Sequence, residues 1–235
     1  MPHFKGYTVA LCIALISASY AHAHTEAPEQ AAQAMHTLNT LSTLKQAWAS
    51  AKYQQQGIAQ VAALEHLLSE FDALHDQAPE RVDVALWYGI TLSTYATTQS
   101  GVSALKAVTH AKRLLEFVVE QEPMIEDGLA YSILGSLYYR VPKWPIGFKN
   151  EAKAAAFLKE ATAKFPDSID ANFLYAEYLK NEKDYTRAEH YYLQGLKSNK
   201  RPGFEVADEG RRQEISHALA ELRQHSRLTR EPVKG

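Results

Sequence analysis

The sequence predicts an all-α protein, a stack of about four helical hairpins closed by a C-terminal capping helix. Glycine and proline are sparse, with 11 and 9 among 235 residues, and they are confined to junctions between apolar-periodic segments. One spacing of small and large apolar residues recurs along the chain, as expected of stacked repeats. A last amphipathic segment follows the final copy, where a helix would cover the exposed end of the stack.

Residues 1–23 have the form of a cleavable signal peptide. Lys5 supplies the positive start, positions 7–19 are mostly apolar, and Ala21-His22-Ala23 is a small-x-small cleavage site. We therefore expect a periplasmic or secreted protein cut after Ala23, with a flexible N-terminus over 24–30. The alternative is a retained anchor, but the apolar run is short for a bilayer, so no stable membrane span is expected.

Composition excludes several classes of function. Cys12 is the only cysteine, and it lies inside the leader after the bulky Leu11, which disfavours lipid attachment. The mature chain would then have no disulfide, no cysteine nucleophile and no cysteine-ligated metal. The formal net charge is −2, and it becomes −3 when Lys5 leaves with the leader, which argues against nucleic acid as a partner.

The second helix of each hairpin carries the clearest repeat. A small residue is followed by a large one four positions later and by a third contact three further on, as in Ala111-Leu115-Val118, Ala154-Leu158-Ala161 and Ala188-Tyr192-Gly195. Positions i, i+4 and i+7 share one helix face, so this face is predicted to pack on the partner helix. An earlier copy reads Leu67, Phe71, Leu74 and Pro79, and prolines 123 and 166 end two later copies.

The first helices place a bulky residue beside a small one at the expected contact, at Tyr88-Gly89, Leu134-Gly135 and Tyr175-Ala176. Residues 31–53 are the expected first helix of the first unit, so one domain covers 31–225. The cap is predicted from about Glu205 to Arg223, with Ile215, Leu219 and Leu222 facing inward. A disordered tail is expected over 226–235. The alternative to a repeat is an ordinary helical bundle with similar spacing.

Two hairpins carry inserts. The third-unit insert, 140–149, contains two prolines and a glycine that would hold Trp144 and Phe148 on a rigid loop. Such aromatics are typical binding anchors, although both could instead fold back and cover their own hairpin. Asn150 is a plausible cap for the next helix. The second insert, around 97–102, is polar and is interpreted as a longer helix pair without a site.

The sequence shows no motif for catalysis. No Gly-rich phosphate loop, nucleophile elbow or zinc-protease motif occurs, so we expect a non-enzymatic protein without a cofactor. The histidines are scattered, with no i, i+4 pair, which is typical of surface positions. One alternative is a copper site at His24, where the mature amine and imidazole could chelate metal together with a second histidine.

The helix pair of the third unit resembles the tetratricopeptide repeat (TPR). It reads Tyr131-x-x-Leu134-Gly135-x-x-Tyr138, then Ala154-x-x-x-Leu158-x-x-Ala161 and Pro166, and the match extends over about 58–200. Segments 135–148 and 201–212 resemble, more narrowly, the T-component family of TRAP-type transporters. That resemblance implies a scaffold that docks a periplasmic solute-binding protein and can form a homo-oligomer. Family members are often lipoproteins, and this chain lacks the lipid-attachment motif.

Two functions follow as hypotheses. In the first, a concave groove docks a protein partner through exposed positions of the first helices: Ser132, Ser136, Tyr139, Asp170, Phe173, Glu177 and Lys180. In the second, a pocket walled by Tyr138, Trp144 and Phe148 binds a small hydrophobic ligand. Arg140, at the start of the insert, is a further contact candidate in either case.

Overall fold

The computed structural model describes residues 40–230, and side chains as far as residue 225. The chain divides into a first unit, 1–44, and a second unit, 45–235. Of the first unit only 40–44 are described, and they are helical. The predictions on the signal peptide, on His24, on the flexible segment 24–30 and on a domain start at 31 lie outside the described residues.

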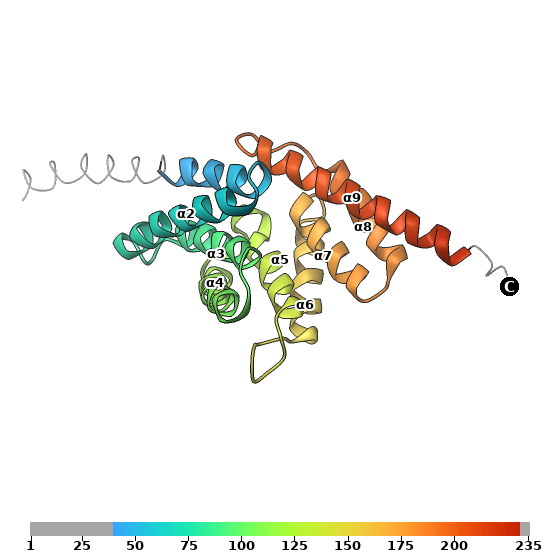
Figure 1. Ribbon diagram of the computed structural model, residues 1–235, viewed down its shortest axis with the longest axis horizontal. Helices are drawn as coiled ribbons and strands as arrows, with labels where there is room; N and C mark the ends of the chain where they lie inside the picture. The colour runs from blue at the N-terminus through green and yellow to red at the C-terminus, as the bar shows by residue number, and fades with distance from the viewer. Residues whose placement is uncertain (1–39, 231–235) are drawn as a thin grey trace, which may run out of the picture. The chain divides into compact units, whose positions relative to one another are not determined.

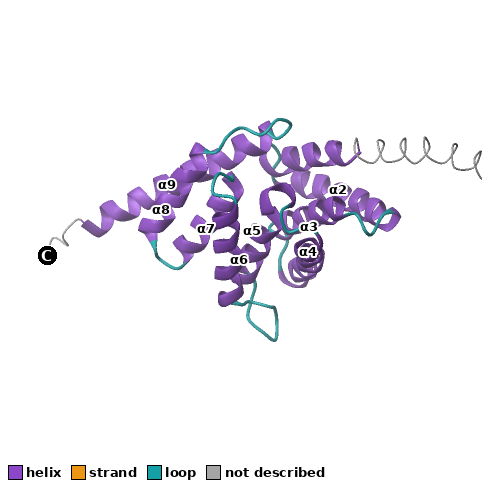
Figure 2. Cartoon of the chain, turned by 180° about the vertical axis from the view of Figure 1, so that it is seen from behind, coloured by secondary structure: helices purple, strands orange, loops and turns teal. Residues whose placement is uncertain are grey.

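Every element of the second unit in the described range is a helix, which confirms the predicted all-α class (Figures 1 and 2). Helical residues 45–53 are followed by eight further helices: α2 Gly57–Gln77, α3 Val82–Ala96, α4 Gly101–Gln121, α5 Ile125–Arg140, α6 Glu151–Lys164, α7 Ile169–Asn181, α8 Tyr185–Lys197 and α9 Glu205–Arg230. Consecutive helices pair as hairpins, α3 with α4, α5 with α6 and α7 with α8. Segment 45–53 is joined to α2 by a short turn, and α9 packs on α8 and α7.

The residues that recur in the predicted repeat are the residues through which the two helices of each hairpin contact each other. All three alanines that start the pattern, at 111, 154 and 188, are fully buried, as are Leu115, Leu158 and Tyr192. A Cβ atom at Gly135 would lie 2.5 Å from Leu158 Cγ, and one at Gly89 would lie 2.9 Å from Leu115 Cγ. The small residues therefore let each first helix approach the large residue of its partner, as the spacing predicted.

The first and second helices differ in burial. In α7 the residues from Ile169 to Ala176 are all buried, whereas α8 buries only its stripe of Ala188, Tyr192 and Gly195. The first helices α3, α5 and α7 contact one another in series, so they form an inner layer and the second helices an outer one. Side chains at the inner layer can therefore face a common space.

Helix ends follow the sequence in most places. Asn150 caps α6 by accepting a hydrogen bond from Lys153 N at 2.9 Å, as predicted. At the start of α5, however, Glu126, Asp127 and Gly128 have positive φ, and the Glu126 carboxylate pairs with Lys45. α9 continues to Arg230, past the expected end at Arg223 and into the segment predicted to be disordered.

Candidate functional site

The N-terminal half of α9 meets segment 45–53, and this contact closes the inner layer. A Cβ atom at Gly210 would lie 2.2 Å from Tyr53 Cδ1, so the ring lies directly on the backbone of α9. Lys52 Nζ lies 3.7 Å from Glu214 Oε1 in the same contact. The cap therefore touches the first described hairpin as well as covering the last one.

A cavity of about 1000 Å³, partly open to solvent, lies beside this contact. Its walls come from segment 45–53, from α3, α5 and α7 of the inner layer, from the N-terminal part of α4, and from α9 with the loop before it. Ligand pockets in proteins commonly have volumes of about 300–1000 Å³. This cavity lies at the upper end of that range, so it has room for a large organic ligand.

One wall of the cavity carries no charge. The lining residues of α3 and α4 are apolar or hydroxyl-bearing: Trp87, Ile90, Ser93, Thr94, Ala96, Gly101, Val102, Ala104, Leu105 and Val108. Thr97, Gln99 and Ser100 of the connecting loop also line the cavity, so the segment predicted to contain no site borders it. The expectation of a longer helix there is correct, since α4 already begins at Gly101.

Aromatic rings connect this wall to the closing contact. The centroids of Trp48 and Trp87 are 5.3 Å apart with nearly perpendicular planes, and Phe204 lies 5.8 Å beyond Trp87. Trp48 Nε1 donates a hydrogen bond to Thr94 Oγ1 at 2.9 Å, which orients the indole. Such edge-to-face contacts add to the burial of the rings themselves.

The opposite side of the cavity holds a network of charges. Asp170 on α7 accepts from Arg211 Nε at 2.8 Å and pairs with Arg201 at 3.0 Å. Arg201 also donates to Asp208 at 2.9 Å, and Arg211 donates to Glu214. The guanidinium of Arg211 lies 4.2 Å from the ring centroid of Phe173, so the cation also contacts an aromatic face.

Burial changes the protonation behaviour of this network. Desolvation, with repulsion from Arg211, lowers the pKa of Lys52 to about 7. Burial by itself would raise the pKa of Asp170, but Arg211, Arg201 and Lys52 outweigh it and hold that pKa below the ordinary value. Asp170 is therefore a carboxylate at neutral pH, while Lys52 exchanges its proton near neutrality.

The predicted groove residues are buried in the inner layer, not exposed. Ser132, Ser136, Tyr139, Asp170 and Phe173 are all buried, because the first helices pack against one another as well as against their hairpin partners. Four of the seven predicted positions still line the cavity: Ser136, Asp170, Phe173 and Glu177.

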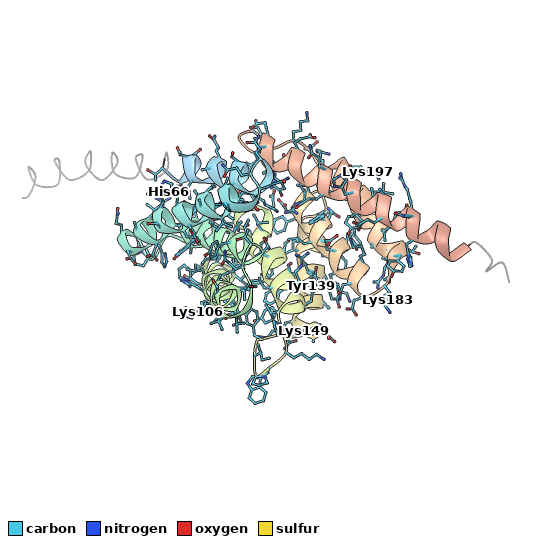
Figure 3. All side chains as sticks on the ribbon, in the orientation of Figure 1. His66, Lys106, Tyr139, Lys149, Lys183 and Lys197 are labelled. Carbon is cyan, nitrogen blue, oxygen red and sulfur yellow. The ribbon has the colours of Figure 1, made fainter. Side chains whose placement is uncertain are left out.

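The other three have packing roles. Tyr139 accepts a hydrogen bond from Arg140 Nε at 3.0 Å and lies between α5 and α7 (Figure 3). Ser132 is fully buried in α5. Lys180 pairs with Glu177 at 3.3 Å and with Glu221 of α9 at 3.1 Å.

The predicted pocket of Tyr138, Trp144 and Phe148 does not form. Phe148 folds back on Tyr138, with ring centroids 5.7 Å apart, and Tyr138 donates to Glu116 at 2.8 Å. Trp144 is instead 85% exposed on the loop between α5 and α6. The alternative of local packing is thus correct for Phe148 and wrong for Trp144. The insert reaches the cavity through other residues, Arg140, Val141, Pro142 and Ile146.

The sequence reasoning missed Lys52, Arg201, Arg211 and Glu214 as site residues. Three of them lie in or near segment 201–212, which drew attention only through a family resemblance. A charged residue on an otherwise buried helix face is the one local signal, because an unpaired charge is seldom buried. Lys52 gives such a signal next to Trp48 and Tyr53, but its partners are distant in sequence.

The described range offers neither a metal site nor a membrane-spanning helix. Within residues 40–230 no three histidine, cysteine or acidic side chains lie together so as to hold a metal ion. In that same range no helix is both long and apolar enough to cross a membrane.

Comparison with known proteins gives no assignment, since no family model matches the sequence and no curated protein matches it either.

Proposed function

We propose that this chain is a non-enzymatic binding protein whose cavity holds a predominantly apolar small molecule. The observation that carries the proposal is the cavity of about 1000 Å³ with an uncharged wall formed by α3 and α4. Apolar lining with a few convergent polar groups is the usual composition of a ligand pocket. The polar groups that line the cavity include paired charges and hydroxyl groups, and they lie beside aromatic rings. Such groups favour binding of a ligand over cleavage of a bond.

The proposal keeps the small hydrophobic ligand that the sequence suggested. It assigns this ligand to the cavity between the helices and not to the loop that carries Trp144. Leu129, Ile133 and Leu137 of α5 follow one helix stripe and line the cavity opposite the α3 residues. Residues of α9 and of the loop before it form part of the cavity wall, so an apolar ligand would lose part of its hydrated surface on entry.

Binding of N-phenyl-1-naphthylamine, a neutral apolar dye whose emission rises in apolar surroundings, tests the proposal. Ile133→Trp would place a bulkier side chain in the cavity beside Leu129 and Leu137, and we expect it to weaken dye binding at least about tenfold. Leu193→Trp is the matched control, because Leu193 is 40% exposed on α8 and does not line the cavity. Equal dye affinity of the two variants, with wild-type circular dichroism, would contradict the proposal.

A second function, docking of a protein partner, is favoured by the loop between α5 and α6. Trp144 and Ile146 are 85% and 67% exposed there, and backbone hydrogen bonds of 3.1 Å close the loop, from Gly147 N to Lys143 O and from Lys149 N to Pro142 O. Lys149 lies where this loop joins α6 (Figure 3). A rigid exposed tryptophan is typical of an interface anchor.

The partner that the TPR and transport resemblances suggest is a periplasmic solute-binding protein. Trp144→Ala should weaken its binding by at least about tenfold in calorimetry. Met124→Ala is the control, since Met124 is 54% exposed away from this loop. Charge reversal at Glu177 or Lys180 is a poor probe of docking, because Glu177 also accepts a hydrogen bond from the buried Tyr192.

A further inference from the structure

The charged side of the cavity contains one cation that is poorly paired. Lys52 Nζ has Glu214 as its ionic contact among the described residues, at 3.7 Å, which is beyond hydrogen-bond length. The other oxygen of Glu214 already accepts from Arg211. Otherwise Lys52 faces the rings of Tyr53 and Trp48, at 4.6 and 5.5 Å from their centroids.

Arg140 is a second cation that has N–H groups without a close carboxylate partner. Its Nε donates to the neutral Tyr139 hydroxyl at 3.0 Å, and its Nη2 lies 3.6 Å from Glu177 Oε2. Glu177 is shared with Lys180 at 3.3 Å and with the Tyr192 hydroxyl. Arg201 and Arg211, in contrast, are engaged by Asp170, Asp208 and Glu214.

We propose that the cavity takes an amphipathic carboxylic acid, with its carboxylate at Lys52, within the field of Arg140, and its apolar chain against the wall of α3 and α4. The inference rests on the proposed function, since it names the class of ligand for the same cavity. Lys52 and Arg140 both line the cavity, so an anion inside it can reach them.

A single negative charge suits this place better than a phosphate or a cation. Lys52 lacks a hydrogen-bonded carboxylate, and its ammonium is largely removed from water, so a ligand carboxylate would supply the missing partner. A dianion would need donors beyond Lys52 and the remaining N–H groups of Arg140, but Arg201 and Arg211 are already paired with carboxylates. A ligand cation would find the carboxylates of Asp170 and Glu214 occupied.

The groups that face Lys52 also predict a proton linkage. They are Tyr53 on its own helix, Arg140 on α5, Asp170 on α7, and Arg211 and Glu214 on α9. Burial and the two arginines lower the pKa of Lys52, and Glu214 and Asp170 raise it, with a net value of about 7. A bound carboxylate stabilises the ammonium, so its binding above pH 7 is accompanied by proton uptake.

Calorimetry with two matched probes, dodecanoate and dodecan-1-ol, tests the inference on the full mature chain. At pH 6 we expect wild type to bind dodecanoate about tenfold to a hundredfold more tightly than the alcohol. Lys52→Met should remove this preference, so that the acid and the alcohol bind with similar affinity. Lys106→Met is the control that keeps the preference, because Lys106 is an exposed lysine of α4 outside the cavity lining (Figure 3).

Proton uptake provides the second readout. Titrations at pH 8 in buffers of different ionisation enthalpy should show uptake approaching one proton per dodecanoate in wild type and none with dodecanol. Lys52→Arg should keep the acid preference without proton uptake, because arginine stays charged. This variant tests the inference even if Lys52→Met fails to fold.

The outcomes separate the two proposals. Equal affinity of wild type for both probes would overturn the acid-binding inference and leave the apolar cavity intact. Absence of binding by either probe would overturn both. A preference for the acid that survives in folded Lys52→Met would also overturn the inference, because the selecting group would lie elsewhere.

Discussion

The ring of Tyr53 lies on the backbone of Gly210, where a Cβ atom would approach Tyr53 Cδ1 to 2.2 Å and Cγ to 2.3 Å. This contact joins α9 to segment 45–53. It lies beside Lys52 and Glu214, so the same closure also brings the charged side of the cavity together.

Gly210→Ala is expected to disrupt this closure. The added methyl group must displace an aromatic ring in a packed contact, and overpacking of this kind costs about 1–3 kcal/mol in the free energy of unfolding. Urea denaturation measures that loss, and binding of N-phenyl-1-naphthylamine should weaken in parallel. Tyr53→Leu makes room for the methyl group, so the double variant should lose less than the sum of the two single variants. Strict additivity would show that the ring and the glycine do not interact.

Gly135→Ala and Gly89→Ala probe the hairpin register. Both should lower the free energy of unfolding, by about 1–3 kcal/mol, because the new Cβ would overlap Leu158 or Leu115. The loss should be larger at position 135, where the approach to Leu158 Cγ is 2.5 Å instead of 2.9 Å. Urea denaturation of both variants gives the comparison, and the reverse order would contradict the packing described.

Asp170→Asn should be the most damaging of the conservative changes in the cavity. The substitution removes the buried carboxylate with which Arg201 and Arg211 pair. Loss of one partner of a buried ion pair lowers the free energy of unfolding by about 3–5 kcal/mol. Thermal and urea unfolding at pH 7 measure the loss. Asp167→Asn, a change at an exposed position three residues earlier on the chain, is the control and should have little effect.

The same carboxylate predicts a dependence of stability on acid pH. The folded pKa of Asp170 is lowered, so its contribution is fully present above the unfolded value of about 4 and is lost as the pH falls through the folded value. The difference in unfolding free energy between wild type and Asp170→Asn should therefore shrink below about pH 4. A difference that stays constant down to pH 2 would argue against a stabilising ion pair.

Lys52 makes a destabilising contribution that is lost as the pH rises, because its pKa is also lowered in the folded chain. Its folded pKa is about 7, below the unfolded value of about 10.4, so the unfolded chain binds the extra proton between these values and stability rises with pH across that window. Lys52→Met removes this component, so the variant should gain stability over wild type at pH 7, and the gain should fall towards pH 10. Urea denaturation along the pH series checks it, with Lys106→Met as the variant that should track wild type.

The hairpins could be predicted because their signals are local. The pairs Ala154 and Leu158, or Ala188 and Tyr192, lie four residues apart on one helix, and their spacing alone assigns them to the buried face. The cap of Asn150 is equally local, since the side chain bonds the amide of Lys153 three residues on. The positions of Phe148 and Trp144 could not be predicted, because either aromatic can pack on its own hairpin or face solvent, and only the fold of the loop decides.

The sequence by itself determined an all-helical stack of hairpins with a capping helix, because helix period, small-to-large packing pairs and proline breaks act within a few residues. Only the tertiary structure decided that the cap returns to segment 45–53 and forms part of the wall of a cavity. Asp170 and Arg211 are separated by 41 residues, and Lys52 meets Glu214 from the other end of the second unit. Such contacts depend on the turn accumulated from hairpin to hairpin, which arises from many small packing angles and from no single motif.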